Sequence, residues 1–63
     1  MDYTLLSIDY KKCSLQTMEG REFRIDPWDI SITVGWIPTS TILFNKDNNF
    51  LQNKSNNQIV KLL

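Results

Sequence analysis

Few residues of this chain could carry out covalent chemistry. The sequence has no histidine and a single cysteine, Cys13, so only Lys, Asp or Glu could act as a base beside a nucleophile. Cys13 falls on the apolar face of a predicted strand, where desolvation favours the neutral thiol over the reactive thiolate. Asp26 and Asp29 could form a general acid–base pair, but their spacing suits the capping of a short helical turn equally well. We therefore expect a protein that is not an enzyme, unless it completes the active site of another chain.

The sequence also predicts neither a metal site nor a cofactor. A structural zinc site needs several convergent Cys or His ligands, which this composition cannot supply. The segment 45–49 (NKDNN) has the oxygen-rich side chains of a calcium loop. It lacks the central Gly and the closing Glu of such a loop, and Lys46 would repel a cation. We interpret this segment as a turn, and the chain has no glycine-rich loop that could cradle a phosphate.

Two tryptophans in predicted loops are the strongest positive signal. Trp28 follows Pro27, and Trp36 stands two residues before Pro38. Aromatic side chains on the loops of SH3-like barrels form grooves that bind extended peptides. The sequence therefore indicates a partner-binding surface near Trp28, Trp36 and Pro38. The alternative is that Trp28 closes one end of a barrel and Trp36 packs under a loop.

The charged residues support a second hypothesis about function. Seven basic and seven acidic side chains give a formal net charge of zero, whereas nucleic-acid binders usually carry a basic excess. Four cations are nevertheless concentrated in the first half of the chain: Lys11, Lys12, Arg21 and Arg24. A single-stranded nucleic acid could contact them through its backbone and stack its bases on Tyr3, Phe23 or a tryptophan. The acidic residues interleaved with these cations favour a mixed, solvated surface instead.

The elements that must position these residues are short β-strands. Apolar and polar side chains alternate from residue 3 to residue 10, with Leu5 blurring the contrast, and two lysines then offer a polar turn. A two-residue loop at 11–12 predicts the pairs Tyr10–Cys13, Ile8–Leu15 and Leu6–Thr17, all on one face. A three-residue loop at 18–20 then pairs Leu15 with Phe23 and Cys13 with Ile25. It also places Gly20 where a type I turn with a G1 bulge needs a positive φ.

This meander predicts an inner face made of Leu6, Ile8, Cys13, Leu15, Phe23 and Ile25. After it we expect at most one helical turn near Pro27, because Asp26 can cap such a turn and Pro suits its first position. A strand is predicted at Ile30–Val34, where apolar and polar residues alternate cleanly. Further strands are predicted at 39–45, with Ile42 and Phe44 inward, at 50–52 and at 58–63.

The spacing of these strands predicts a single all-β domain covering residues 1–63. At this length a closed or partly open barrel leaves fewer unpaired strand edges than a flat sheet. We expect a small SH3-like barrel of five to six short antiparallel strands. An OB-like barrel is the alternative, although that fold usually has a longer helix between its third and fourth strands. A core this small gives only marginal stability, so a homodimer is a further alternative.

The middle third of the chain carries a recognisable order of residues: Glu19-Gly20, Phe23, Ile25, Pro27, Ser31 and Trp36-Ile37-Pro38-Thr39-Ser40-Thr41-Ile42. This order resembles a group of short bacterial proteins that share a D-G turn, an aromatic-x-V strand and a W-x-P-G-D-x-V segment. The chain departs from that pattern at Thr39-Ser40, where Gly-Asp is usual. The resemblance implies a small β-rich fold and no particular activity.

The first residues give an expectation about location. Residues 1–6 contain no basic region and no apolar run precedes Asp9, so we expect neither a secretory signal nor a membrane span. A lone cysteine fits a reducing compartment, which makes the cytoplasm the expected location. The sequence thus predicts a cytoplasmic, non-catalytic interaction or accessory module. Its expected partner is a protein or a second copy of itself, with single-stranded nucleic acid as the alternative.

Overall fold

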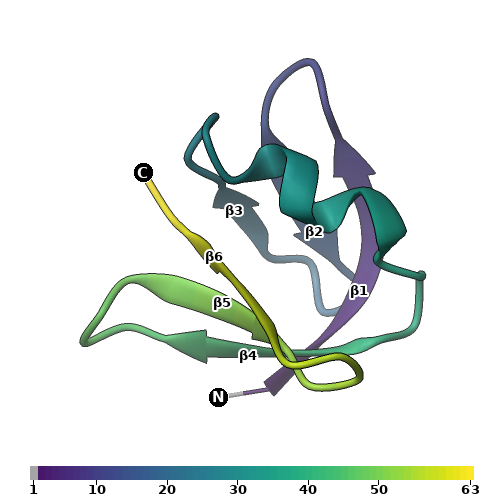
Figure 1. Cartoon of the computed structure of the whole chain (residues 1–63). Helices are drawn as coiled ribbons and strands as arrows, with labels where there is room; N and C mark the ends of the chain where they lie inside the picture. The colour runs from purple at the N-terminus through teal and green to yellow at the C-terminus, as the bar shows by residue number, and fades with distance from the viewer. Residues whose placement is uncertain (1) are drawn as a thin grey trace.

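A computed structural model describes residues 2–63, which form six antiparallel strands and one short 3₁₀ helix (Figure 1). The elements are β1 (Asp2–Asp9), β2 (Ser14–Thr17), β3 (Glu22–Arg24), the helix η1 (Ile30–Gly35), β4 (Thr41–Asn45), β5 (Phe50–Asn53) and β6 (Gln58–Lys61). The strands make one sheet in the order β3-β2-β1-β4-β5-β6. The prediction of an all-β chain of five to six short antiparallel strands is confirmed.

Strand β1 connects the two halves of the sheet. Its first residues, Asp2–Thr4, pair with β4, and from Leu5 onward it pairs with β2. Figure 1 shows β1 in purple, running from the N-terminus beside β4 up to β2. The edge strands β3 and β6 meet beyond their ends at a single antiparallel bridge between Ile25 and Leu62. The sheet therefore curves round one core, but its two edges share this contact without a continuous ladder.

The first hairpin contains a β-bulge that the alternation did not predict. Ile8 pairs with Leu15 as expected, but Leu5, and not Leu6, lies opposite Thr17. Ser7 then pairs with the preceding residue of β2, so Leu6 is the extra residue of the bulge. As a result Leu5 points into the core with 1% of its surface exposed, while Leu6 is 46% exposed. The prediction that Leu6 faces inward is wrong for this reason.

The turn between β1 and β2 is longer than the predicted two residues. Asp9 pairs with Ser14, which leaves four residues in the turn. The Asp9 carboxylate accepts the backbone N–H groups of Lys11 and Lys12 at 3.0 and 3.1 Å, and such a contact favours a tight local turn. Cys13 ends the turn with a φ of 52° and is only half-buried. The predicted strand pairing of Cys13 with Tyr10 and its place on the core face are therefore wrong.

The turn between β2 and β3 agrees with the prediction. Leu15 pairs with Phe23, and Gly20 has a φ of 89°. The N–H of Thr17 donates to the carbonyl of Arg21 at 2.8 Å, which closes a three-residue loop. The predicted relation of Cys13 to Ile25 survives as one backbone hydrogen bond, from the Ile25 N–H to the Cys13 carbonyl at 2.7 Å.

The predicted strand at Ile30–Val34 is wrong, because Ile30–Gly35 form the 3₁₀ helix η1. The chain enters it through hydrogen bonds of i→i+3 type, from the Asp29 N–H to the Asp26 carbonyl and from the Ile32 N–H to the Asp29 carbonyl. Ile30, Thr33 and Trp36, three residues apart, are covered: Ile30 packs against the core, as Ile32 also does, and Thr33 and Trp36 are buried. A period of three matches a 3₁₀ helix. The polar Thr33 hides this period in the sequence, and its hydroxyl donates to the Ile30 carbonyl at 2.7 Å.

The core lies inside the curve of the sheet. Its buried apolar residues are Tyr3, Leu5, Leu15, Phe23, Ile25, Trp36, Ile42, Leu51 and Val60. The prediction is confirmed for Leu15, Phe23, Ile25 and Ile42. Phe44 and Ile8 are half-buried and pack against the edge of the core.

Gly20→Ala should lower the free energy of unfolding by about 1–2 kcal/mol, because a side chain at φ 89° strains the backbone. The cost is purely conformational, since an added Cβ would meet no atom within 4 Å. Gly35→Ala is the matched control: its Cβ also meets open space, and the helical position should gain up to about 1 kcal/mol. Urea denaturation measures both variants. Equal unfolding free energies for the two would contradict the backbone explanation.

Glu19 links the β2–β3 turn to β1, because its Oε1 accepts the backbone N–H of Thr4 at 2.8 Å. This hydrogen bond lowers the pKa of Glu19 from its ordinary value of 4.5. A depressed folded-state pKa stabilises the protein above pH 4.5, and that contribution is lost as the pH falls below 4.5 through the folded-state value. Glu19→Gln should therefore flatten the dependence of the unfolding free energy on pH in this acid range. Denaturant titrations at a series of pH values test this, and an unchanged slope would contradict it.

Candidate functional site

The structure separates the two tryptophans. Trp28 stands on the turn before η1 and is 90% exposed. Trp36 follows η1 and is only 6% exposed, and its indole N–H donates to the side-chain oxygen of Gln58 on β6 at 2.7 Å. Pro38 is exposed two residues further on. The burial of Trp36 agrees with the alternative, in which this residue packs under a loop. The exposure of Trp28 contradicts the other part of that alternative, in which Trp28 closes the end of a barrel.

Trp36 and Pro38 do share one feature, a shallow apolar groove beside β1. The groove has a volume of about 270 Å³ and is lined by Leu5, Leu6, Ser7, Ile8, Tyr10, Trp36 and Pro38. We call it the Trp36 groove. Trp28 is not among its lining residues. Two residues of the predicted partner surface, Trp36 and Pro38, therefore lie together, and the third, Trp28, lies apart from them.

The β1 wall of the groove is a consequence of the bulge. Because the bulge turns Leu6 outward, this side chain lines the groove instead of the core. Tyr10 is half-exposed at the end of the same wall, and its hydroxyl donates to the carbonyl of Thr33 on η1 at 3.4 Å. Sequence reasoning missed both residues as groove residues. The signal was present in the doublet Leu5-Leu6, since two successive apolar residues interrupt a strict alternation.

The opposite wall is the loop from Trp36 to Ser40, which backbone hydrogen bonds tie to β1. The Leu5 N–H donates to the carbonyl of Ser40 at 2.9 Å, and the Thr39 N–H donates to the carbonyl of Leu5 at 2.8 Å. Thr39 has a φ of 77°, which turns the chain sharply from η1 into β4. The Ser40 hydroxyl adds a bond to the Ile37 carbonyl at 2.6 Å. Both walls are therefore fixed before any ligand arrives.

The strand edge beside the groove lacks a strand partner. Residues Ser7–Asp9 of β1 pair with β2 on one side. Strand β4 pairs with β1 only at Asp2–Thr4, so within residues 2–63 no strand lies against the other side of Ser7–Asp9. An unpaired edge of this kind is a template for an added extended chain.

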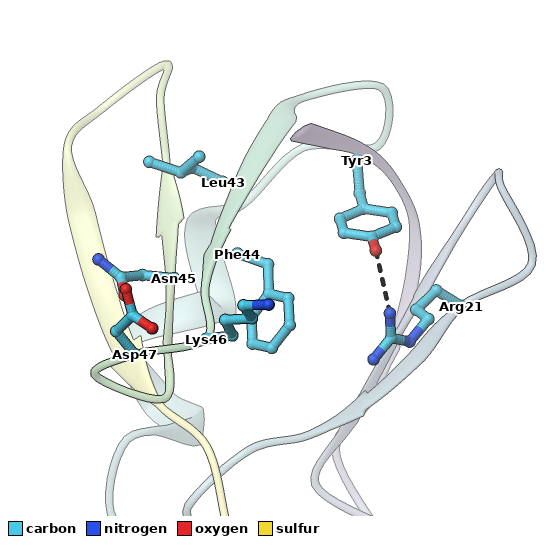
Figure 2. Close-up of a pocket in the computed structure, with 7 residues that line it drawn as sticks. All are labelled: Tyr3, Arg21, Leu43, Phe44, Asn45, Lys46 and Asp47. Carbon is cyan, nitrogen blue, oxygen red and sulfur yellow. Dashed lines mark hydrogen bonds between the residues drawn. The ribbon is translucent and has the colours of Figure 1, made fainter. Parts of the chain in front are cut away.

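A larger hollow lies at the other end of β1, next to β4. It has a volume of about 600 Å³ and is lined by Tyr3, Arg21, Leu43, Phe44, Asn45, Lys46 and Asp47. We call it the Arg21 pocket. Figure 2 shows Tyr3, Arg21 and Phe44 around one opening, with the Tyr3 hydroxyl accepting a hydrogen bond from Arg21 at 3.0 Å.

The four cations of the nucleic-acid hypothesis do not line one hollow. Lys11, Lys12 and Arg24 line a separate depression together with Glu22. Arg21 instead lines the Arg21 pocket. The proposed stacking residues Tyr3 and Phe23 are both buried in the core, which leaves little ring surface for a base. Binding of single-stranded nucleic acid stays a prediction.

The residues considered for chemistry have structural contacts. Asp26 accepts the backbone N–H of Trp28 at 3.0 Å, and Asp29 accepts that of Lys61 at 2.8 Å, so both carboxylates bind main-chain donors. The Cys13 thiol donates to the carbonyl of Tyr10 at 3.8 Å. Residues 2–63 contain no cluster of three His, Cys, Asp or Glu side chains that could hold a metal ion. In the same range, no helix has the length and apolar character needed to cross a membrane.

Trp36→Ala should lower the free energy of unfolding by about 3–5 kcal/mol, because it empties a core position and leaves Gln58 without its indole donor. Trp28→Ala is the matched control and should change it by at most about 0.5 kcal/mol, because its side chain is already in solvent. Thermal denaturation followed by circular dichroism compares the two. Similar losses for both variants would contradict the separate roles.

Comparison with known proteins adds no relative. No protein-family model, curated protein or solved structure matches the chain. The resemblance to the short bacterial proteins stays a prediction. Any function must therefore be argued from the geometry of the Trp36 groove and the Arg21 pocket.

Proposed function

We propose that this chain is a non-catalytic interaction module that binds an extended peptide segment of a partner protein in the Trp36 groove. The observation that carries the proposal is that exposed apolar side chains and an unpaired strand edge lie side by side. We further propose that the fold is a small SH3-like barrel. Six short antiparallel strands, one 3₁₀ helix and the bridge between Ile25 and Leu62 support that assignment.

An extended peptide fits this groove because it can use both of its features. Its backbone can hydrogen-bond to the free edge at Ser7–Asp9, as in recognition by strand addition. Its side chains then alternate between the two sides, so that every second one reaches the groove. Leu6, Tyr10 and Pro38 offer that side chain apolar contacts. The partner segment is therefore expected to have apolar residues at alternate positions.

A flexible segment fits better than a second copy of the folded chain. Leu6 and Pro38 both line the groove beside the free edge. A single extended chain needs only the room of one strand there, whereas a second folded sheet would also have to fit against the loop that carries Pro38. No charged side chain lines the groove, and Asp9 and Lys11, which line the neighbouring hollow, have opposite charges, so binding should depend little on salt.

Selection from a phage-displayed library of random decapeptides should enrich sequences with alternating apolar residues. In a titration followed by ¹⁵N–¹H correlation spectra, such a peptide should shift the amide signals of Ser7–Asp9. Leu6→Asp should weaken its binding at least about tenfold, because it places a charge in the apolar wall. Ile59→Asp is the matched control, since Ile59 is 47% exposed on β6, outside the groove. It should leave the affinity unchanged.

Three results would contradict this proposal. One is a selected peptide that binds Leu6→Asp as tightly as the wild type. Another is a peptide whose signal shifts lie away from Ser7–Asp9. The third is a chain that selects no peptide but binds single-stranded oligonucleotides with an affinity that falls steeply with salt, which would favour the nucleic-acid alternative.

A further inference from the structure

Arg21 is held in one orientation by three aromatic rings. Its guanidinium carbon lies 5.9 Å from the ring centroid of Tyr3, 5.0 Å from that of Phe23 and 5.6 Å from that of Phe44. The rings also pack on one another, with centroids 5.3 Å apart for Tyr3 and Phe23 and 4.9 Å apart for Phe23 and Phe44. A hydrogen bond to the Tyr3 hydroxyl at 3.0 Å fixes the direction of the guanidinium. Such cation–π contacts favour this placement over free rotation in solvent.

Most hydrogen-bond donors of Arg21 remain available. A guanidinium carries five N–H donors in a planar fork, and the Tyr3 hydroxyl accepts one of them. Within residues 2–63, the ion pair joins Lys54 to Asp2, and no carboxylate lies within ion-pair distance of Arg21. The positive charge is therefore oriented but not neutralised by the protein.

This charge faces the Arg21 pocket. In Figure 2 the side chains of Tyr3, Arg21, Phe44 and Lys46 lie toward the opening between β1 and β4. The side chains of Leu43, Asn45 and Asp47 lie on the other side of β4 in the same view. The interior thus combines two cations with aromatic walls. The volume of about 600 Å³ belongs to the whole hollow, including the part lined by Leu43, Asn45 and Asp47.

We propose that the Arg21 pocket binds a small molecule made of a planar ring that carries an oxyanion, as an aromatic carboxylate or a mononucleotide does. The oxyanion accepts two parallel hydrogen bonds from the fork of Arg21, and Lys46 adds a second positive charge. The ring packs against Phe44, which is only half-buried and offers part of its surface. A simple anion would leave the aromatic wall without contacts.

The same observations favour a small molecule over a nucleic-acid strand. A strand needs several phosphate contacts along its length. The other cations of the first half, Lys11, Lys12 and Arg24, line a different depression, so they cannot extend the site.

The test is a titration of the ¹⁵N-labelled chain with benzoate, uridine monophosphate, acetate and inorganic phosphate at constant ionic strength. We expect benzoate or uridine monophosphate to shift the Nε–H signal of Arg21 and to bind at least about tenfold more tightly than acetate or phosphate. Arg21→Gln should lower that affinity at least about tenfold. Arg24→Gln is the matched control and should leave it unchanged, because Arg24 is an exposed arginine outside the pocket.

Arg21→Gln removes the cation that packs over three aromatic rings, so a second variant is needed in case this one does not fold. Lys46→Gln changes an exposed side chain and should weaken binding by a smaller factor without loss of the folded spectrum. Binding of benzoate alone or of the nucleotide alone would support the proposal and identify the source of the oxyanion. The proposal is overturned by any of three results: no shift with the four compounds, neither benzoate nor uridine monophosphate binding more tightly than acetate and phosphate, or equal losses in Arg21→Gln and Arg24→Gln.

Discussion

The register of β1 is the constraint on which the rest of the structure depends. This strand pairs with β4 at Asp2–Thr4 and with β2 from Leu5 onward, so both halves of the sheet take their positions from it. The change of partner falls at the bulge, where Leu5 points inward and Leu6 outward. Without the extra residue, the two leucines would exchange faces: the core would lose Leu5 and the Trp36 groove would lose its β1 wall. One local irregularity therefore serves packing and surface chemistry together.

The two candidate binding sites, the Arg21 pocket and the Trp36 groove, take residues from β1 on either side of the bulge. Before the bulge, Tyr3 is buried in the core and its hydroxyl accepts a hydrogen bond from Arg21. After it, Tyr10 is half-exposed and donates to Thr33 on η1. The strand thus supplies a tyrosine to the Arg21 pocket and another to the Trp36 groove. Their environments differ, because one pocket is cationic and aromatic while the other is an apolar groove beside open backbone.

Local signals in the sequence were sufficient for part of this arrangement. The glycine at position 20 fixed the loop between β2 and β3, and the pairing of Leu15 with Phe23 followed from it. The bulge could not be predicted, because alternation assigns each residue to a face of the sheet but does not show where an extra residue is inserted. The helix η1 was not predicted, because the apolar residues of 30–34 alternate as they do in a strand. Burial of the polar Thr33 depends on the tertiary fold. Arg21 could not be placed either, since its aromatic neighbours come from three strands that only the folded sheet brings together.

Trp36 shows why stability and binding are coupled in so small a domain. Its ring belongs to the core and its indole N–H donates a hydrogen bond to Gln58, yet the same residue lines the Trp36 groove. A chain of 63 residues has too little core to reserve separate aromatics for each task. The unpaired edge at Ser7–Asp9 is a liability of the free protein, because it can pair with unrelated chains. A peptide that pairs with this edge binds only the folded state, so it would remove that liability and stabilise the domain by mass action. Under our proposal, the region of β1 that the fold leaves least protected is therefore the one that a partner completes.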